Sequence, residues 1–201
     1  MNTLTAKSGR PRTVDRAKTI DIAMRAYWER GADAVSVNEI SKLAEVSKPS
    51  LYREFGSEDG LMAAALGQFA ELSVAPLLAL LRSDAPTDAI LDQVALSVVE
   101  GGKTGDLPAG CMVTPMFAMR SRFGDKTEAL VSALQRDSLA AYQAFAERLD
   151  REGRLPSHHS PRDTALFLNA SVGMAMMSMK QGFTPDEVAA MLRVAFAPFR
   201  D

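Results

Sequence analysis

The stretch that decides the fold is residues 36–61, Ser-Val-Asn-Glu-Ile-Ser-Lys-Leu-Ala-Glu-Val-Ser-Lys-Pro-Ser-Leu-Tyr-Arg-Glu-Phe-Gly-Ser-Glu-Asp-Gly-Leu. It predicts two short helices joined by a tight turn. Ser36 is a good N-cap for the first helix, and Glu39, three residues later, completes the pattern of a capping box. This helix should end near Glu45. Its buried face should consist of Val37, Ile40 and Leu43.

The second helix should begin after Ser47, another good N-cap, and end at Gly56. Pro49 falls in its first turn, where the missing N–H costs little. Leu51 and Phe55 are four residues apart, so both must pack against the helices behind. The residues left on or near the outer face are Lys48, Pro49, Ser50, Tyr52 and Arg53.

The helix before this pair should run from about Val14 to Arg30, with Gly31 as its C-cap. Its apolar residues recur at helical spacing and are Ile20, Ala23, Met24, Tyr27 and Trp28. Three helices in this order predict a helix-turn-helix unit, which places its last helix in the major groove of DNA. An outer face with lysine, serine, tyrosine and arginine suits phosphate and base-edge contacts. The first amides of the 36–45 helix can bind a further phosphate.

The rest of the chain shows helical periodicity and no sustained β-type alternation, so we expect an all-α protein of about nine helices. A fourth helix, capped by Ser57, should lead through Phe69 toward Pro76 and connect the first unit to the rest. Further helices are expected at about 87–100, 111–122, 125–152, 162–181 and 185–199. The predicted organisation is an arm over 1–13, a helix-turn-helix domain over 14–56 and a helical bundle over 57–201.

The net charge of −2 gives no overall basic signature, but the N-terminus differs from the average. Residues 1–18 contain five basic residues and one acidic residue, an excess of four positive charges. An arm of this kind can contact phosphates or enter the minor groove, and it can equally be a solvated tail. No apolar run approaches the ~20 residues of a bilayer span. With a single cysteine, the composition favours a cytoplasmic protein that does not enter a membrane.

The region 31–61 resembles the DNA-binding domain of the TetR family of transcriptional regulators. The matching residues are Gly31, Val37, Ile40, Ala44, Val46, Ser47, Lys48, Ser50, Leu51, Tyr52, Phe55, Ser57, Asp59 and Leu61. The resemblance implies a ligand-responsive repressor that binds a near-palindromic operator as a homodimer and is released by a small molecule. It also implies that double-stranded operator DNA is contacted by Lys48, Pro49, Ser50 and Tyr52, with Ser36 and Asn38 assisting; Ser47 and Arg53 lie beside them.

Two carboxylates depart from the family pattern. Glu58 stands where many members carry a lysine that contacts phosphate, and Glu54 stands where an aromatic residue or histidine is common. Both should weaken non-specific binding without abolishing recognition. We hypothesise that the arm compensates for this loss, mainly through Arg10 and Arg12.

The resemblance also implies an effector pocket in the second half of the chain. Apolar residues that can line it are Leu66, Phe69, Met112, Met116, Phe117 and Phe123, although core packing explains any one of them. Few charges fall in this set, which favours an uncharged or weakly polar ligand, while Arg120 and Arg122 leave an anion open. Cys111, in a Gly-Cys-Met-Val element similar to one branch of the family, is either a small packed side chain or an oxidisable thiolate; packing is favoured.

Residues 167–179 combine small side chains with methionines and are apolar around most of the helix, which indicates a helix buried on more than one side. One side is available for a second subunit, together with the last helix. The resemblance implies the same arrangement, a four-helix bundle between two copies. The predicted interface residues are Phe167, Ser171, Met174, Met177, Val188, Met191 and Phe196.

Two other classes of function stay open. An all-helical enzyme is one, but no histidine or cysteine is paired with acids at useful spacing. A TetR-like adaptor that has lost operator binding is the other, with Glu54 and Glu58 as its signs. We expect no cofactor and no metal site, since the adjacent His158 and His159 lie in a proline-containing loop that is typical of solvated surface.

The arm hypothesis makes a direct prediction. Deleting residues 1–12 should reduce affinity for DNA and flatten its dependence on salt, because fewer counterions are released on binding. Affinity measured across a salt series checks this. A salt dependence equal to that of the full chain would exclude the arm from the interface.

Overall fold

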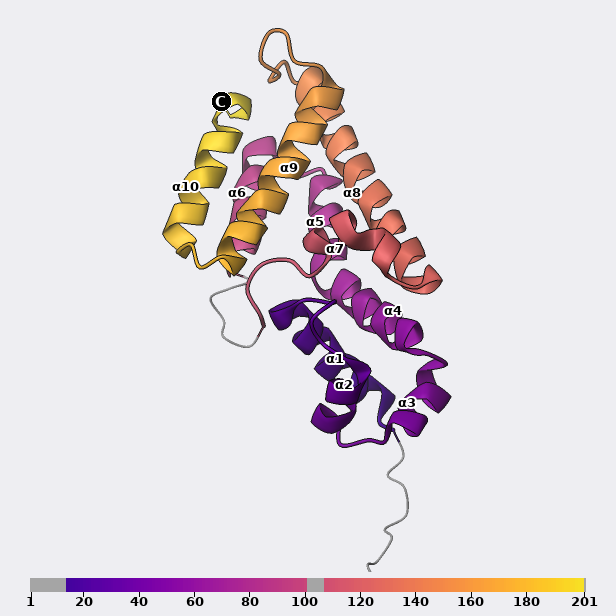
Figure 1. Cartoon of the computed structure of the whole chain (residues 1–201). Coiled ribbons are helices and arrows are strands. Elements are labelled where there is room, and N and C mark those ends of the chain that lie inside the picture. The colour runs from indigo at the N-terminus through magenta and orange to yellow at the C-terminus, as the bar shows by residue number, and fades with distance from the viewer. Residues whose placement is uncertain (1–13, 101–106, 201) are drawn as a thin grey trace, which may run out of the picture.

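A computed structural model describes residues 14–100 and 107–200, and these are helical with no strand among them (Figure 1). The all-α prediction is confirmed. The predicted arm with Arg10 and Arg12 lies outside the described residues. The N-terminal unit contains α1 (Arg16–Arg30), α2 (Val37–Leu43) and α3 (Lys48–Phe55). The chain then continues with α4 (Glu58–Phe69), a π-helical turn η1 (Ala70–Val74) and α5 (Ala75–Leu81).

The second half is built from helices that pack on one another at the other end of the molecule, and α8 and α9 are the longest of them (Figure 1). They are α6 (Thr87–Glu100), α7 (Val113–Met119) with the 3-10 turn η2 (Arg120–Arg122), α8 (Asp125–Arg151), α9 (Pro161–Lys180) and α10 (Pro185–Phe196) with the 3-10 turn η3 (Ala197–Phe199). The helix predicted over 111–122 is therefore shorter than expected. α9 packs between α8 and α10, and α10 also packs on α6.

The bridging helix is longer than the sequence indicated. α4, η1 and α5 form one continuous stretch, Glu58–Leu81, that passes through Pro76. Proline is tolerated here because the i→i+5 bonding of η1 precedes it, so Pro76 falls in the first turn of α5. Counted as one helix, this stretch brings the described part of the chain to the predicted total of nine.

This bridging stretch is also long and apolar enough, by length and composition, to cross a membrane. Its uninterrupted apolar runs are shorter, since Gln68 and Glu71 divide them. Leu61, Leu66 and Phe69 are almost completely buried within the protein. α4 packs against α1 on one side and α8 on the other, so it is the central helix of the fold.

Two local predictions for α2 are wrong. Leu43 is 51% exposed, because α2 ends there and its last turn points away from the core formed by Val37 and Ile40. The capping box is only half formed: Ser36 Oγ accepts the N–H of Glu39 at 3.3 Å, but the Glu39 carboxylate pairs with Arg30 of α1. A complete capping box is present at the start of α10, between Thr184 and Glu187.

α8 is capped by a residue from another helix. Its N-cap position is Gly124, which has no side chain to satisfy the first amides. The Asp59 carboxylate of α4 accepts the N–H groups of Lys126 and Thr127 at 3.0 and 3.1 Å. A Cβ on Gly124 would lie 2.5 Å from Asp59 Cγ, so glycine is required for this close approach. Asp59 therefore ties the start of α4 to the start of α8.

The cap also affects the ionisation of Asp59. Burial acts to raise its pKa, but the hydrogen bonds from Thr127 and Lys126 outweigh burial and hold the pKa below its usual range. The folded state thus favours the ionised carboxyl. The resulting stabilisation is fully present above the unfolded pKa of about 3.9 and is lost as pH falls through the lower, folded value.

Asp59→Ala should therefore lower the free energy of unfolding by about 1 kcal/mol at neutral pH, as for the loss of an N-cap. The difference from the wild type should shrink as pH falls from about 3.9 to the lower, folded pKa of Asp59, below which the wild type also lacks the charged cap. Urea unfolding at a series of pH values measures this. Asp33→Ala, at an exposed position, is the control; an equal loss there would show that the cap contributes nothing specific.

Candidate functional site

α3 presents a small polar surface at one end of the molecule. Ser47 caps it by accepting the N–H of Ser50 at 3.3 Å, and Gly56, with a φ of 79°, ends it. Leu51 and Phe55 are buried in the core, as predicted. The Lys48 ammonium lies 5.5 Å from the centre of the Tyr52 ring, while Pro49 and Arg53 are exposed. Lysine, tyrosine and arginine side chains are thus held together on a rigid helix.

Ser50 is not on the outer face, which corrects the prediction. It is 5% exposed, and its hydroxyl lies 2.8 Å from Ser47 Oγ. Arg53 Nη2 donates to the same hydroxyl at 3.3 Å. Because an i, i+3 spacing places Ser47, Ser50 and Arg53 on one side of α3, Ser50 becomes the support that orients Arg53. The outer surface consists of Pro49 and Arg53, which are exposed, and of Lys48 and Tyr52, which are partly exposed.

The two carboxylates that depart from the family pattern both have partners within the protein. Arg16 of α1 donates to Glu54 Oε1 at 3.1 Å and also lies over the Phe55 ring, 4.9 Å from its centre. Glu58 Oε1 accepts the N–H of Val37, in the first turn of α2, at 3.3 Å. Ser36 and Asn38 are exposed beside this turn. The sequence placed Arg16 at the start of the first helix, among the basic residues of 1–18, and did not indicate its pairing with Glu54.

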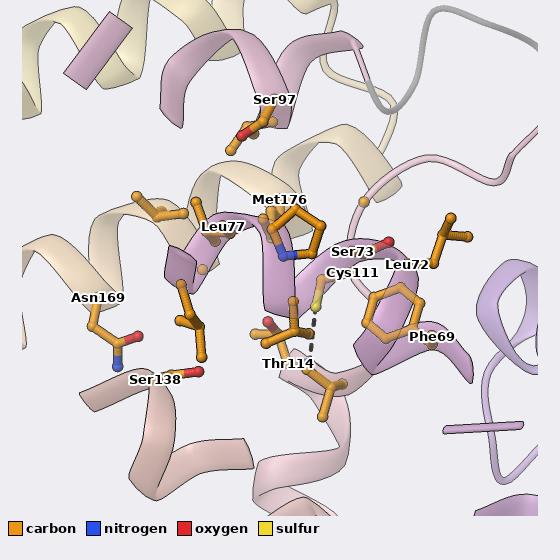
Figure 2. A pocket seen from close by; sticks show the side chains of 18 of the residues that line it. Phe69, Leu72, Ser73, Leu77, Ser97, Cys111, Thr114, Ser138, Asn169 and Met176 are labelled. Atoms are coloured by element: carbon orange, nitrogen blue, oxygen red, sulfur yellow. Dashed lines mark hydrogen bonds between the residues drawn. The ribbon is translucent and has the colours of Figure 1, made fainter. Parts of the chain in front are cut away.

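A cavity of about 370 Å³ lies in the second half of the protein, between the bridging stretch and helices α6 to α9 (Figure 2). Its wall is mostly apolar, with Leu72 and Leu77 from the bridging stretch and Met176 from α9 (Figure 2). Polar groups come from Ser97 on α6 and from Ser138 and Asn169 on α8 and α9. No residue with a formal charge is among the described residues that line it.

Only part of the predicted effector set lines this cavity. Phe69 and Phe117 do, whereas Phe123 lines a second pocket between the 32–36 loop, α4 and the start of α8. Leu66, Met112 and Met116 are fully buried core residues outside the lining. Arg120 and Arg122 do not reach it either. The missed residues, such as Trp28, Tyr142 and Asn169, come from distant helices, and no local pattern could have grouped them.

Cys111 is packed in the wall of the cavity at the start of α7. It is 5% exposed, and its sulfur accepts the N–H of Thr114 at 3.4 Å (Figure 2). The neighbouring Gly110 has a φ of 79°, and a Cβ there would lie 2.6 Å from the carbonyl oxygen of Met176. The structure thus places Cys111 as a small packed side chain, the first of the two sequence interpretations.

The wall of the cavity is joined directly to the helix-turn-helix unit. Trp28, the last buried aromatic residue of α1, lines the cavity and donates its indole N–H to the carbonyl of Gly110 at 3.0 Å. Its ring packs edge to face on Phe69 of α4, with 4.8 Å between ring centres. A shift of the 110–111 backbone would therefore move Trp28, and with it the end of α1.

α9 and α10 carry most of the exposed apolar surface. Six of the nine large apolar side chains that are exposed in the described part of the chain lie on these helices or the turn between them: Leu166, Phe167, Met174, Phe183, Met191 and Val194. Val188 and Phe196, predicted to face a second subunit, are instead at most 1% exposed and belong to the core of their own chain. Ser171 and Met177 are partly exposed on α9.

Comparison with known proteins supports the sequence resemblance. Residues 20–65 match the family model described as bacterial regulatory proteins, tetR family. The chain is 28% identical over 178 residues to the HTH-type transcriptional repressor ComR of Escherichia coli (strain K12), covering 87% of this chain and 83% of ComR. It is 34% identical over 105 residues to the HTH-type transcriptional repressor BdcR of the same strain, about half of each chain.

The fold is similar to that of solved TetR-family regulators. A cysteine mutant of the TetR family transcriptional regulator CifR, complexed with 26-bp double-strand operator DNA, superposes with a TM-score of 0.76 at 21% identity, over 94% of this chain and 98% of that one. The matched domain contains α1 to α3 and the start of α4, which form the polar surface described above. Residues 20–65 thus form a DNA-binding domain of the tetR family, and the chain, which is similar over most of its length to a transcriptional repressor, is a DNA-binding transcriptional regulator.

Proposed function

We propose that the protein is a repressor that binds a near-palindromic operator as a homodimer and is released when a small molecule enters the cavity. The observation that carries this proposal is the surface of α3, where Lys48, Tyr52 and Arg53 are held together beside the exposed Pro49. Side chains of these types bind phosphates and base edges. The repressor relatives ComR and BdcR support the direction of regulation.

The DNA contacts in this proposal come from two helices. Lys48, Tyr52 and Arg53 of α3 enter the major groove, with Ser47 and Pro49 at its edge. Ser36 and Asn38 hold a phosphate at the start of α2. The Glu58 carboxylate already accepts the first of the α2 amides, so fewer amides are free for phosphate. Ser50 acts indirectly, by orienting Arg53.

The second copy in the proposed dimer covers α9 and α10. Phe167 and Met174 are seven residues apart on one face of α9, and both are about half exposed. Met191 and Val194 continue this apolar surface on α10. Exposed apolar surface gathered on two neighbouring helices is typical of a protein interface. A two-fold pair would place the two α3 helices roughly 34 Å apart, one turn of DNA.

Release requires that the ligand binds the two states of the dimer with different affinity, typically by about 1–3 kcal/mol. The hydrogen bond from Trp28 to Gly110 and the packing of Trp28 on Phe69 give a route from the cavity to α1 and α4. In this mechanism residues 14–56 bind DNA, and residues 57–201 bind the effector and the second subunit, in the cytoplasm.

The experiment that tests the proposal is selection of DNA from a random pool by the full chain. We expect an enriched sequence with two related half-sites about one helical turn apart. Met174→Glu should then yield monomers in analytical ultracentrifugation and lose binding to the paired half-sites, while Met174→Leu keeps both properties. No enriched sequence would favour the adaptor alternative, and a Met174→Glu protein that stays dimeric would place the interface elsewhere.

The pairing of Arg16 with Glu54 makes a separate prediction. Arg16→Ala should reduce operator affinity by roughly two- to five-fold, because an unpaired carboxylate then faces the phosphates. Adding Glu54→Gln should recover most of this loss. Affinities of the single and double variants from fluorescence anisotropy measure the coupling.

Arg25→Ala is the matched control, since it removes the same charge from α1 but Arg25 pairs with Asp21. An equal loss in that variant, or no recovery with Glu54→Gln, would mean that Arg16 acts only through its long-range charge.

A further inference from the structure

The cavity follows the bridging stretch, and two contacts mark its ends. One end lies at Trp28, which lines the cavity and packs on Phe69, with 4.8 Å between ring centres. The other end lies at Ser138 of α8. Arg82, the residue after α5, donates to the carbonyl of the neighbouring Asp137 at 3.3 Å, so the end of α5 lies beside this part of α8. The cavity therefore extends from α4 to the end of α5, and Figure 2 shows Phe69 and Ser138 on opposite sides of the view.

The length and the volume of the cavity together give its width. Residues of the bridging stretch line it from Phe69 to Leu80, and a helix rises about 1.5 Å per residue, so the cavity is roughly 16 Å long. A volume of about 370 Å³ over that length leaves a cross-section of roughly 20 Å², close to that of a single extended hydrocarbon chain. Such a shape favours an elongated ligand over a compact ring system.

Most of the wall is apolar and uncharged. Leu77, Phe117 and Met176 contribute to it from the bridging stretch, α7 and α9. The described lining contains no arginine, lysine, aspartate or glutamate. An ion that enters such a cavity loses its hydration without gaining a counter-charge, which is strongly unfavourable. The anion alternative that Arg120 and Arg122 left open finds no support in this wall.

The end of the cavity at which α8 meets α9 is polar. Ser138 and Asn169 line it from these two helices, and both residues are partly exposed. Neither side chain has a hydrogen bond within the described part of the chain, and neither has a polar atom among the buried unpaired ones. Their polar groups therefore keep accessible surface, and Figure 2 shows both side chains on the same side of the cavity. A hydroxyl and an amide can together donate to and accept from one neutral group.

We propose that the effector is an elongated, neutral aliphatic molecule with one polar end, of the class of medium-chain alcohols. Its hydroxyl binds Ser138 and Asn169, and its chain extends along the bridging stretch to Trp28. This rests on the proposed function, because it names the chemical class of the ligand whose binding releases DNA. Asn169 belongs to α9, which carries the proposed subunit interface, and Trp28 belongs to α1. A ligand that reaches both residues contacts the two parts of the protein whose relative position must change.

A series of linear alcohols tests the shape by isothermal titration calorimetry with the full chain. From 1-hexanol through 1-octanol to 1-decanol, we expect the affinity to rise about four-fold per methylene, the worth of one buried CH₂. 1-Adamantanol has the same number of carbons and the same end group as 1-decanol but is much wider, so it should bind at least about ten-fold more weakly than 1-decanol, as should the decanoate anion. An affinity that does not rise with chain length would overturn the proposal. So would equal binding of 1-adamantanol or decanoate, or no binding by any of the alcohols.

Ser138→Ala tests the polar end. It should lower the affinity for 1-decanol by about two- to ten-fold, the worth of one neutral hydrogen bond, and Asn169→Leu should act in the same direction. The melting temperature of the free protein should not fall in Ser138→Ala, because this hydroxyl has no partner within the described chain. Ser132→Ala is the matched control, since Ser132 is a partly exposed serine of α8 outside the lining. An unchanged affinity in Ser138→Ala, or an equal loss in Ser132→Ala, would contradict the assignment.

The fluorescence of Trp28 reports on the other end, because Trp28 is the single tryptophan of the chain and lines the cavity. At saturation, 1-decanol should change its emission much more than 1-hexanol, whose chain is too short to reach it. Equal changes with the two alcohols would mean that the chain does not extend from the Ser138 end.

The same probes separate this inference from the proposed function. If 1-decanol binds with these properties but leaves the affinity for the selected DNA unchanged, the ligand class holds and the release mechanism fails. If DNA is released by 1-adamantanol or decanoate and not by 1-decanol, the protein is ligand-responsive and the inferred class is wrong.

Discussion

The Asp59 carboxylate connects the two halves of the molecule. It sits in the first turn of α4, two residues after the Ser57 cap that follows α3, and it accepts the first amides of α8. α8 is the longest described helix and packs on α4, α5 and α9. Because the ionised carboxylate also complements the dipole at the N-terminus of α8, the cap favours one register between the two helices. The position of α3 relative to α9 depends on this contact.

A second contact holds the same two halves together. Trp28 joins α1 to the 110–111 backbone through its indole N–H, and it packs on Phe69 of α4. The helix-turn-helix unit is therefore attached directly at the cavity wall through Trp28, and indirectly through α4, which Asp59 joins to the start of α8. If a ligand shifts the 110–111 backbone relative to α8, these contacts pass the movement to α1 and α4. A ligand can alter the spacing of two recognition helices only if such a movement reaches them.

The acidic overall charge is compatible with DNA binding because the carboxylates nearest to α3 are occupied within the protein. Glu54 pairs with Arg16, and Glu58 accepts the Val37 amide. Each contact reduces the repulsion that a free carboxylate would exert on phosphate. The family departures noted from the sequence are thus compensated at least in part by neighbours in the fold. Compensation by the arm stays a prediction.

Sequence patterns predicted correctly those features of the helices that depend on neighbouring residues. Ser36, Ser47 and Ser57 all cap helices as expected, because a cap involves residues only three positions apart. Predictions that needed a partner from elsewhere were less accurate. Ser50 was assigned to the outer face and Val188 and Phe196 to a subunit interface, since helical periodicity does not tell which of two apolar or small faces meets the core.

The sequence by itself determined the all-α class, the helix-turn-helix and the resemblance of that unit to the TetR family, because these follow from short-range spacings. Only the tertiary structure decided the joint at Asp59, the pairing of Arg16 with Glu54 and the composition of the cavity. Each of these brings together side chains that are 38 or more positions apart. Such contacts depend on how helices pack, and short-range sequence patterns carry no record of that packing.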